Sequence, residues 1–177
     1  DRRDGFMIEV PNHMFTSFLY KSLGIELSID SDQIDDVFWN ASNYCVPTDG
    51  IKELLEYLDS TGIRTAVVSN ISFSGKALKN KINKSIPFNK FEFVIASSEY
   101  IFRKPSKHIF ELALNMAELS AEEIWFVGDN YKCDVVGAES VGITAFLYGS
   151  HVNDISEPHC RKISHWKEFI EVIKKAK

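Results

Sequence analysis

Residues 124–134 read IWFVGDNYKCD, an apolar run that ends in a glycine and an acid. Such a run, bounded by turn residues, is typical of a buried strand in a parallel sheet. Gly128 lets the backbone turn there without a side-chain clash. Asp129 follows the strand directly, and Asp134 comes five residues later, near the start of an expected helix. By itself this pattern fits a loop acid and a helix cap equally well.

Short strands and amphipathic helices alternate from about residue 51 onward, which is typical of βαβ units. The spacing predicts strands over 64–68, 91–96, 124–127 and 144–147, and helices over 51–58, 75–82, 107–119, 134–140 and 166–173. Before residue 46 the pattern is mostly helical. We therefore expect an α/β fold, with a doubly wound, Rossmann-like parallel sheet over residues 47–177 and a separate helical lobe over residues 1–46.

The composition excludes several classes of protein. With 177 residues, 45% hydrophobic, and a net charge of -5, the chain has no basic footprint that would attract nucleic acid. No apolar run approaches the roughly 20 residues that cross a bilayer, so we expect no membrane partner. Three scattered cysteines do not form a disulfide framework, which favours a reduced, cytoplasmic setting. The oligomeric state cannot be deduced.

Polar residues follow two further strands of the expected sheet. Ser69 and Asn70 come after the first strand, and Lys104 precedes Pro105 after the second. Because the carboxyl ends of parallel strands meet at one edge of the sheet, these residues are candidates for a site shared with the two acids. Taken one at a time, Ser-Asn is common in turns and Lys-Pro is common on surfaces.

In this order, Ser-Asn, Lys-Pro and Gly-Asp with a second Asp five residues on, the chain resembles the haloacid dehalogenase-like hydrolase superfamily, with closest likeness over residues 47–148. The resemblance implies that Ser69 and Lys104 are catalytic and that they bind the phosphoryl group together with Asn70. It also implies that Asp129 and Asp134 hold Mg²⁺, and that the helical lobe over residues 1–46 is part of a cap inserted after the first strand.

The sequence departs from this family at its first motif. The resemblance implies an Asp-x-Asp-Gly whose first Asp attacks phosphorus, but the nearest stretch, residues 6–12, has Glu9 and Pro11 in place of the two aspartates. Either the chain lacks an N-terminal segment or it is a complete, inactive relative, and we expect the former. The missing strand would be central in the sheet, so something must pair with its neighbours. That could be missing residues, the 6–10 run or another chain.

Three functions follow as hypotheses. The first is a magnesium-dependent phosphatase that hydrolyses a small phosphorylated metabolite through an aspartyl-phosphate, with this chain inactive by itself. The second is a metal-independent dehalogenase, against which the pair Asp129 and Asp134 argues, because clustered acids beside a nucleophilic aspartate need a cation. The third is an inactive member that binds a ligand or partner, with the 6–10 run paired into the sheet.

Overall fold

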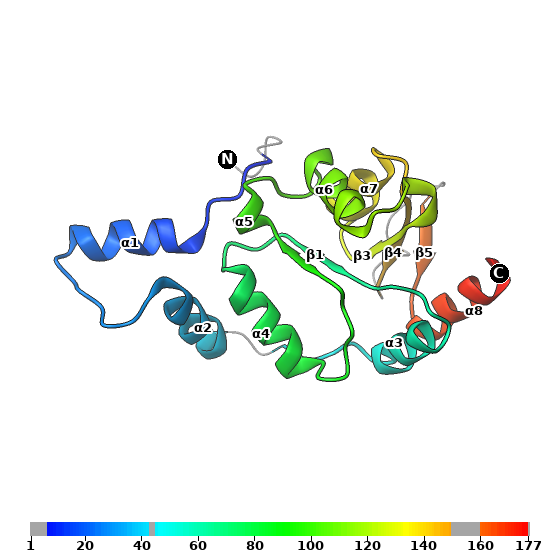
Figure 1. Ribbon diagram of the computed structural model, residues 1–177, viewed down its shortest axis with the longest axis horizontal. Coiled ribbons are helices and arrows are strands. Elements are labelled where there is room, and N and C mark those ends of the chain that lie inside the picture. The colour runs from blue at the N-terminus through cyan, green and yellow to red at the C-terminus, as the bar shows by residue number, and fades with distance from the viewer. Residues whose placement is uncertain (1–6, 43–44, 150–159, 177) are drawn as a thin grey trace. The chain divides into compact units, whose positions relative to one another are not determined.

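The computed structural model describes residues 7–42, 45–149 and 160–176, which belong to two compact units. The first unit comprises Asp1–Pro47 with Ala66–Arg103, and the second comprises Thr48–Thr65 with Lys104–Lys177. Each unit contains a parallel β-sheet with its own helices (Figure 1). The predicted α/β class with parallel strands is therefore confirmed, whereas the boundary between cap and core near residue 46 stays a prediction.

The sheet of the first unit has two parallel strands, β1 (Val67–Ser69) and β2 (Val94–Ala96). Both are shorter than the apolar runs predicted. Its helices are α1 (Asn12–Ser22), α2 (Ser31–Ser42), α4 (Gly75–Ser85) and α5 (Ser97–Tyr100). The crossover helix α4 connects the two strands in the chain, as the spacing predicted. Ser69 is therefore the last residue of a strand rather than the residue after it.

Two helices in this unit show how far the sequence sets local structure. Ser74 is the N-cap of α4, and its side chain accepts a 3.2 Å hydrogen bond from the Ala77 N–H. In α1 the helical spacing of the aromatic residues was predicted correctly, but Phe15 and Phe18 remain 62% and 73% exposed. Helical periodicity thus identified α1 without identifying a buried face for it.

The sheet of the second unit has three parallel strands in the order β3-β4-β5, which are Trp125–Gly128, Thr144–Tyr148 and Arg161–Ile163. The other elements are α3 (Ile51–Ser60), α6 (Lys107–Ala117), the 3₁₀ turn η1 (Ala121–Glu123), the π-helix η2 (Tyr131–Val136), α7 (Gly137–Glu139) and α8 (Trp166–Ala176). Strand β5 was not predicted, because its three residues RKI carry almost no apolar signal.

Helices cover both faces of this sheet, as a doubly wound fold requires. Alternate residues of a strand point to opposite faces, and Phe146 of β4 joins a buried cluster with residues of α3 and α8. On β3, Phe126 instead contacts Phe110 of α6, with ring centroids 5.2 Å apart in an edge-to-face pair. Figure 1 shows α3 and α8 together on one side of β3–β5, and α6 with α7 on the other.

The start of α3 is tied to the start of α8. Gly50 is the N-cap of α3 with a φ of 79°, a left-handed conformation that favours glycine. The Thr48 hydroxyl accepts a 2.7 Å hydrogen bond from the Trp166 indole N–H. The Lys167 N–H donates to His165 Nδ1, so His165 Nε2 carries the proton and donates to Asp49 Oδ2 at 3.1 Å. These contacts join the two helices at their N-termini.

The pKa of Asp49 provides a test of this connection. The hydrogen bond from His165 lowers the pKa of Asp49 below its ordinary value of 3.8. Because the folded-state pKa is the lower one, the contact stabilises the fold above pH 3.8, and this contribution is lost as the pH falls through the folded-state pKa. We expect His165→Ala to return the Asp49 pKa toward 3.8 in an NMR titration of the carboxyl carbons.

Glu123 is the control in the same titration. Its pKa is lowered by the hydrogen bond from the Ser120 N–H within the capping box, where the Ser120 N–H lies 2.9 Å from Glu123 Oε2. The His165→Ala variant should leave the pKa of Glu123 unchanged. An Asp49 pKa that stays equally low without the imidazole would show that the contact does not form in solution.

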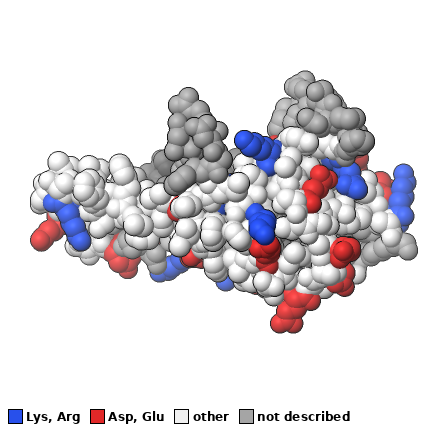
Figure 2. Space-filling view, turned by 90° about the horizontal axis from the view of Figure 1, so that it is seen from above, with Lys and Arg blue, Asp and Glu red and all other residues white. Residues whose placement is uncertain are grey.

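Charges of both signs are mixed on the surface. On the face shown in Figure 2, Lys and Arg side chains alternate with Asp and Glu, and the described residues there form no continuous basic patch. Within the described ranges, no helix has the length and apolar character needed to cross a bilayer. The absence of a nucleic-acid partner stays a prediction from the sequence.

Candidate active site

Asp134, one of the predicted site residues, is buried and contacts Lys104 and Asn130. It is 3% exposed, and its Oδ1 atom lies 2.6 Å from Lys104 Nζ. Its Oδ2 atom accepts a 2.9 Å hydrogen bond from the Asn130 N–H. The Lys104 ammonium also lies 5.3 Å from the centre of the Phe126 ring, within the range of a cation–π contact. Two of the predicted site residues, from distant parts of the chain, are thus in direct contact.

The π-helix η2 gives Asp134 its place. The Asp134 N–H donates to the Asn130 carbonyl at 2.7 Å, and the Asn130 side-chain oxygen accepts from the Cys133 N–H at 2.9 Å. Asn130 therefore caps the turn with its side chain and binds the Asp134 carboxylate with its own N–H. π-Helical turns are rare in proteins overall, and those that occur often lie at functional sites. The sequence analysis did not single out Asn130, although an Asn after a strand is a usual N-cap.

Gly128 lets the Asp134 side chain fold back against the end of β3. A Cβ atom placed on residue 128 would lie 2.3 Å from Asp134 Cγ and 2.4 Å from its Oδ2. Real Cβ atoms do not approach other atoms so closely, so a larger residue would displace the carboxylate. The sequence analysis assigned Gly128 to a backbone turn, but the structure shows that close approach of a side chain is the stronger reason for glycine.

The acids fit Mg²⁺ by their chemistry and number. Asp129 follows β3 directly and is exposed, whereas Asp134 is buried. Both offer hard oxygen ligands, and Mg²⁺ commonly takes one or two protein carboxylates, with water and substrate phosphate as its other ligands. In the part of the chain that the structure describes, no cluster of three or more His, Cys, Asp or Glu side chains could hold a metal ion. The metal assignment of both acids stays a prediction.

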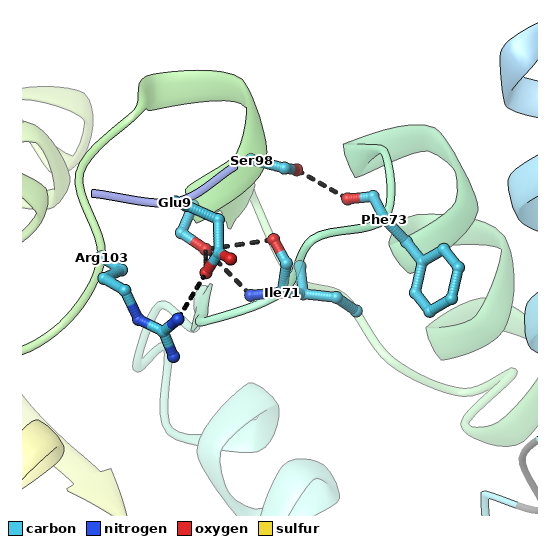
Figure 3. Close-up of polar contacts among 6 residues, drawn as sticks. Glu9, Ile71, Phe73, Ser98 and Arg103 are labelled. Atoms are coloured by element: carbon cyan, nitrogen blue, oxygen red, sulfur yellow. Dashed lines mark hydrogen bonds and ion pairs between the residues drawn. The ribbon is translucent and has the colours of Figure 1, made fainter. Parts of the chain in front are cut away.

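Ser69 and Asn70 belong to the first unit, at the end of β1, and both are half-buried. The loop that follows them is fastened by α5. The Ile71 N–H donates to Ser97 Oγ at 2.8 Å, and Ser98 Oγ donates to the Phe73 carbonyl at 2.6 Å (Figure 3). The structure thus places the predicted phosphate-binding residues beside a well-anchored loop.

Residues 7–10, the stretch compared with the missing first motif, do not form a strand of either sheet. Ile8 forms an isolated antiparallel bridge with Phe102, and the Arg103 N–H donates to the Met7 carbonyl at 2.9 Å. Glu9 is 3% exposed and lies 3.3 Å from Arg103 Nη1, so its carboxylate is an ion-pair partner rather than a free nucleophile. Phe6 lies outside the described residues.

Comparison with known proteins identifies the family. The model of the haloacid dehalogenase-like hydrolase family matches residues 19–148, which include all five predicted site residues. The chain belongs to this family. The resemblance inferred from Ser69-Asn70, Lys104 and the two acids is therefore confirmed.

Curated relatives of this chain include phosphatases. The human haloacid dehalogenase-like hydrolase domain-containing protein 3 is 33% identical over 56% of this chain and 38% of its own length. A glyceraldehyde 3-phosphate phosphatase of Methanothermobacter thermautotrophicus is 32% identical over 59% of this chain and 46% of the enzyme. A ribulose-1,5-bisphosphate 5-phosphatase of Halopiger xanaduensis is 27% identical over 79% and 61%, respectively. The chain spans about half the length of the curated relatives it matches.

Solved structures confirm the Rossmann-like fold of the chain. A HAD phosphatase from Thermococcus onnurineus has a TM-score of 0.61 at 22% identity, over 89% of this chain and 69% of that one. A 2-haloacid dehalogenase from Pseudomonas syringae has a TM-score of 0.61 at 21% identity, over 73% and 54%. At these identities the likeness concerns the fold and does not distinguish phosphatase from dehalogenase.

Proposed function

We propose that this protein is a magnesium-dependent phosphatase acting on a small phosphorylated metabolite. The observation that carries the proposal is the ion pair between Lys104 and the buried Asp134 at the end of β3, because it places a fixed ammonium beside an acid suited to a metal. The family membership and the phosphatase relatives support the same reaction class. The three free cysteines agree with a cytoplasmic setting.

In the proposed reaction, the first aspartate of the family's first motif attacks phosphorus, forming a carboxylate O–P bond as the ester P–O bond breaks. A general acid protonates the departing alkoxide, and water then hydrolyses the aspartyl-phosphate, which restores the carboxylate and releases inorganic phosphate. The nucleophile and the acid belong to the family's first motif, and residues 6–12 carry Glu9 and Pro11 where that motif has its two aspartates.

The residues of this chain stabilise charge in that scheme. The Lys104 ammonium would neutralise a phosphoryl oxygen, and Ser69 with Asn70 would donate hydrogen bonds to the other oxygens. Asp129 and Asp134 would hold Mg²⁺, which offsets the negative charge that develops on the phosphoryl group. The Asn130 N–H would hold the Asp134 carboxylate in place through its 2.9 Å hydrogen bond to Oδ2.

Two other functions remain as outcomes of the test. A dehalogenase attacks carbon and needs no metal, so activity without Mg²⁺ on a haloacid, and none on a phosphate ester, would favour it. An inactive, ligand-binding relative was expected to have residues 6–10 paired into the sheet. In the described part of that run, residues 7–9 contact 101–103 instead, which removes this support for inactivity.

The test is hydrolysis of p-nitrophenyl phosphate by the protein expressed from its complete gene. We expect turnover with Mg²⁺ and its loss with a chelator, with recovery on adding Mg²⁺ back. Asp129→Asn should lower turnover at saturating substrate by on the order of 10²-fold or more, because it removes one charged oxygen ligand of the metal. Asp59→Asn, an exposed acid at the end of α3, is the matched control.

The result that would refute the proposal is equally specific. If the complete protein hydrolyses no phosphate ester at any Mg²⁺ concentration, the phosphatase assignment is wrong. If it does so but Asp129→Asn and Asp59→Asn are equally active, the metal assignment of Asp129 is wrong while the reaction class stands.

A further inference from the structure

A buried carboxylate in the first unit takes no part in the proposed reaction. Glu9 is 3% exposed, and its Oε2 atom lies 3.3 Å from Arg103 Nη1 and 3.0 Å from Ser97 Oγ. Figure 3 shows its side chain directed toward Arg103 and toward the loop that contains Ile71. A buried carboxylate is tolerated only where it is paired and hydrogen-bonded. The three side chains therefore form one polar network.

The backbone fixes Glu9 as firmly as its side chain does. The Arg103 N–H donates to the Met7 carbonyl at 2.9 Å, and the Glu9 N–H donates to the Ile101 carbonyl. Ile8, between them, bridges Phe102 in antiparallel fashion. The backbone of Glu9 and of the two residues before it is thus fixed by contacts with residues 101–103. The Glu9 carboxylate can therefore hold Ser97 in a defined position.

Ser97 connects Glu9 to the loop after β1 through hydrogen bonds. Its side chain is completely buried, and its oxygen accepts the Ile71 N–H at 2.8 Å. Its single proton has two possible acceptors, Glu9 Oε2 at 3.0 Å and the Ile71 carbonyl at 3.1 Å. A carboxylate is the stronger acceptor, and the Ile71 carbonyl already accepts the Ser98 N–H at 3.2 Å. The proton therefore points to Glu9 and the lone pairs point to the Ile71 N–H.

Ile71 follows Ser69 and Asn70 directly in the chain, so its peptide group determines where that turn lies. We propose that Glu9 is a positioning residue for phosphate binding: through Ser97 it holds the Ile71 peptide, and thereby the Ser69-Asn70 turn that contacts the phosphoryl group. This inference rests on the proposed function, since it needs Ser69 to bind phosphate. Misplacing such a group by about 1 Å lowers catalytic efficiency on the order of 10²-fold.

Two variants separate positioning from loss of stability. Glu9→Gln removes the charge and leaves Arg103 without its carboxylate, so it will also destabilise the protein. Ser97→Ala keeps the ion pair between Glu9 and Arg103 and breaks only the connection to Ile71. Both should raise the KM for p-nitrophenyl phosphate about 10-fold or more, and both should speed hydrogen exchange of the Ile71 amide by a similar factor.

Asp35→Asn is the matched control. Asp35 is 1% exposed and also fastens this loop, but at its far end, where its Oδ2 atom accepts the Ser74 N–H at 2.8 Å and its Oδ1 atom accepts the Asn12 amide at 2.7 Å. Within the described residues, these contacts of Asp35 lie at the far end of the loop and not at the turn that precedes Ile71. Its variant should be less stable than the wild type, with the KM and the Ile71 exchange rate within about twofold of wild type.

The outcomes are distinct. Unchanged exchange of the Ile71 amide in Ser97→Ala overturns the inference, and so does faster exchange with an unchanged KM. An equal rise in KM for Asp35→Asn overturns it as well, because the effect would then be a general loss of stability. A wild-type protein that hydrolyses no ester refutes the proposed function and the phosphate-binding part of this inference, while the exchange rates still decide whether Glu9 holds the turn.

Discussion

Lys104→Met should remove most of the turnover and much of the stability. Methionine keeps the apolar stem but removes the ammonium that lies 2.6 Å from Asp134 Oδ1. Breaking a buried ion pair from one side leaves an uncompensated charge and costs about 3–5 kcal/mol. Loss of a group aimed at transition-state charge lowers turnover by about 10²–10³-fold. Urea unfolding and the kcat for p-nitrophenyl phosphate at saturating Mg²⁺ measure the two effects.

Lys107→Met is the control, three residues along the same segment. The Lys107 side chain is 61% exposed and pairs with Glu111 at 3.4 Å. An exposed pair of this kind contributes less than about 1 kcal/mol, so this variant should unfold and react much as the wild type does. Equal stability and turnover for the two lysine variants would contradict the role given to Lys104.

A double variant separates the two effects of Lys104. Lys104→Met combined with Asp134→Asn removes both charges of the buried pair, so much of the stability lost in the single variant should return. Turnover should not return, since neither the ammonium nor the charged carboxylate is restored. Recovery of turnover in the double variant would show that Lys104 serves only to neutralise Asp134.

The sequence predicted the elements with strong periodic signals. The apolar stripe over 51–58 lies in α3, as predicted. The apolar run before Gly128 forms β3, and Asp129 follows its end. Such patterns succeed because burial of one helix face or one strand is the largest local energy involved. Lys104, which the sequence made a candidate for a site shared with the acids, lies 2.6 Å from Asp134 Oδ1. The expectation used the rule that strand ends of one parallel sheet meet at one edge, but β2 and β3 belong to different sheets, so that rule does not explain this contact.

Features that depend on single hydrogen bonds were not predicted. The π-helix η2 depends on Asn130, whose side chain caps the turn while its N–H binds Asp134. Glu9 is an ion-pair partner of Arg103 because residues 7–9 pair with 101–103, a long-range contact without periodicity. Strand β5 is three residues long and mostly polar, and its place comes from pairing with β4. Propensity carries no information on such contacts.

Gly128→Ala should lower stability and turnover although it adds only one methyl group. The new Cβ would lie 2.3 Å from Asp134 Cγ, so the carboxylate must leave its place beside Lys104 and Asn130. Overpacking a well-filled site typically costs about 1–3 kcal/mol, and here it also separates a buried ion pair. We expect a loss of about 3 kcal/mol in urea unfolding, with a fall in kcat that approaches that of Lys104→Met.

Gly75→Ala shows whether the added methyl group matters by itself. A Cβ on Gly75 would lie 2.4 Å from the carboxylate of Glu99, which is exposed and accepts a 3.0 Å hydrogen bond from the Gly75 N–H, so rotating it away costs only one solvent-exposed hydrogen bond. Alanine also favours the first turn of α4, so this variant should change stability by less than about 1 kcal/mol. If Gly128→Ala proves as stable and active as Gly75→Ala, Asp134 does not fold back against β3, and the site geometry derived from it is wrong.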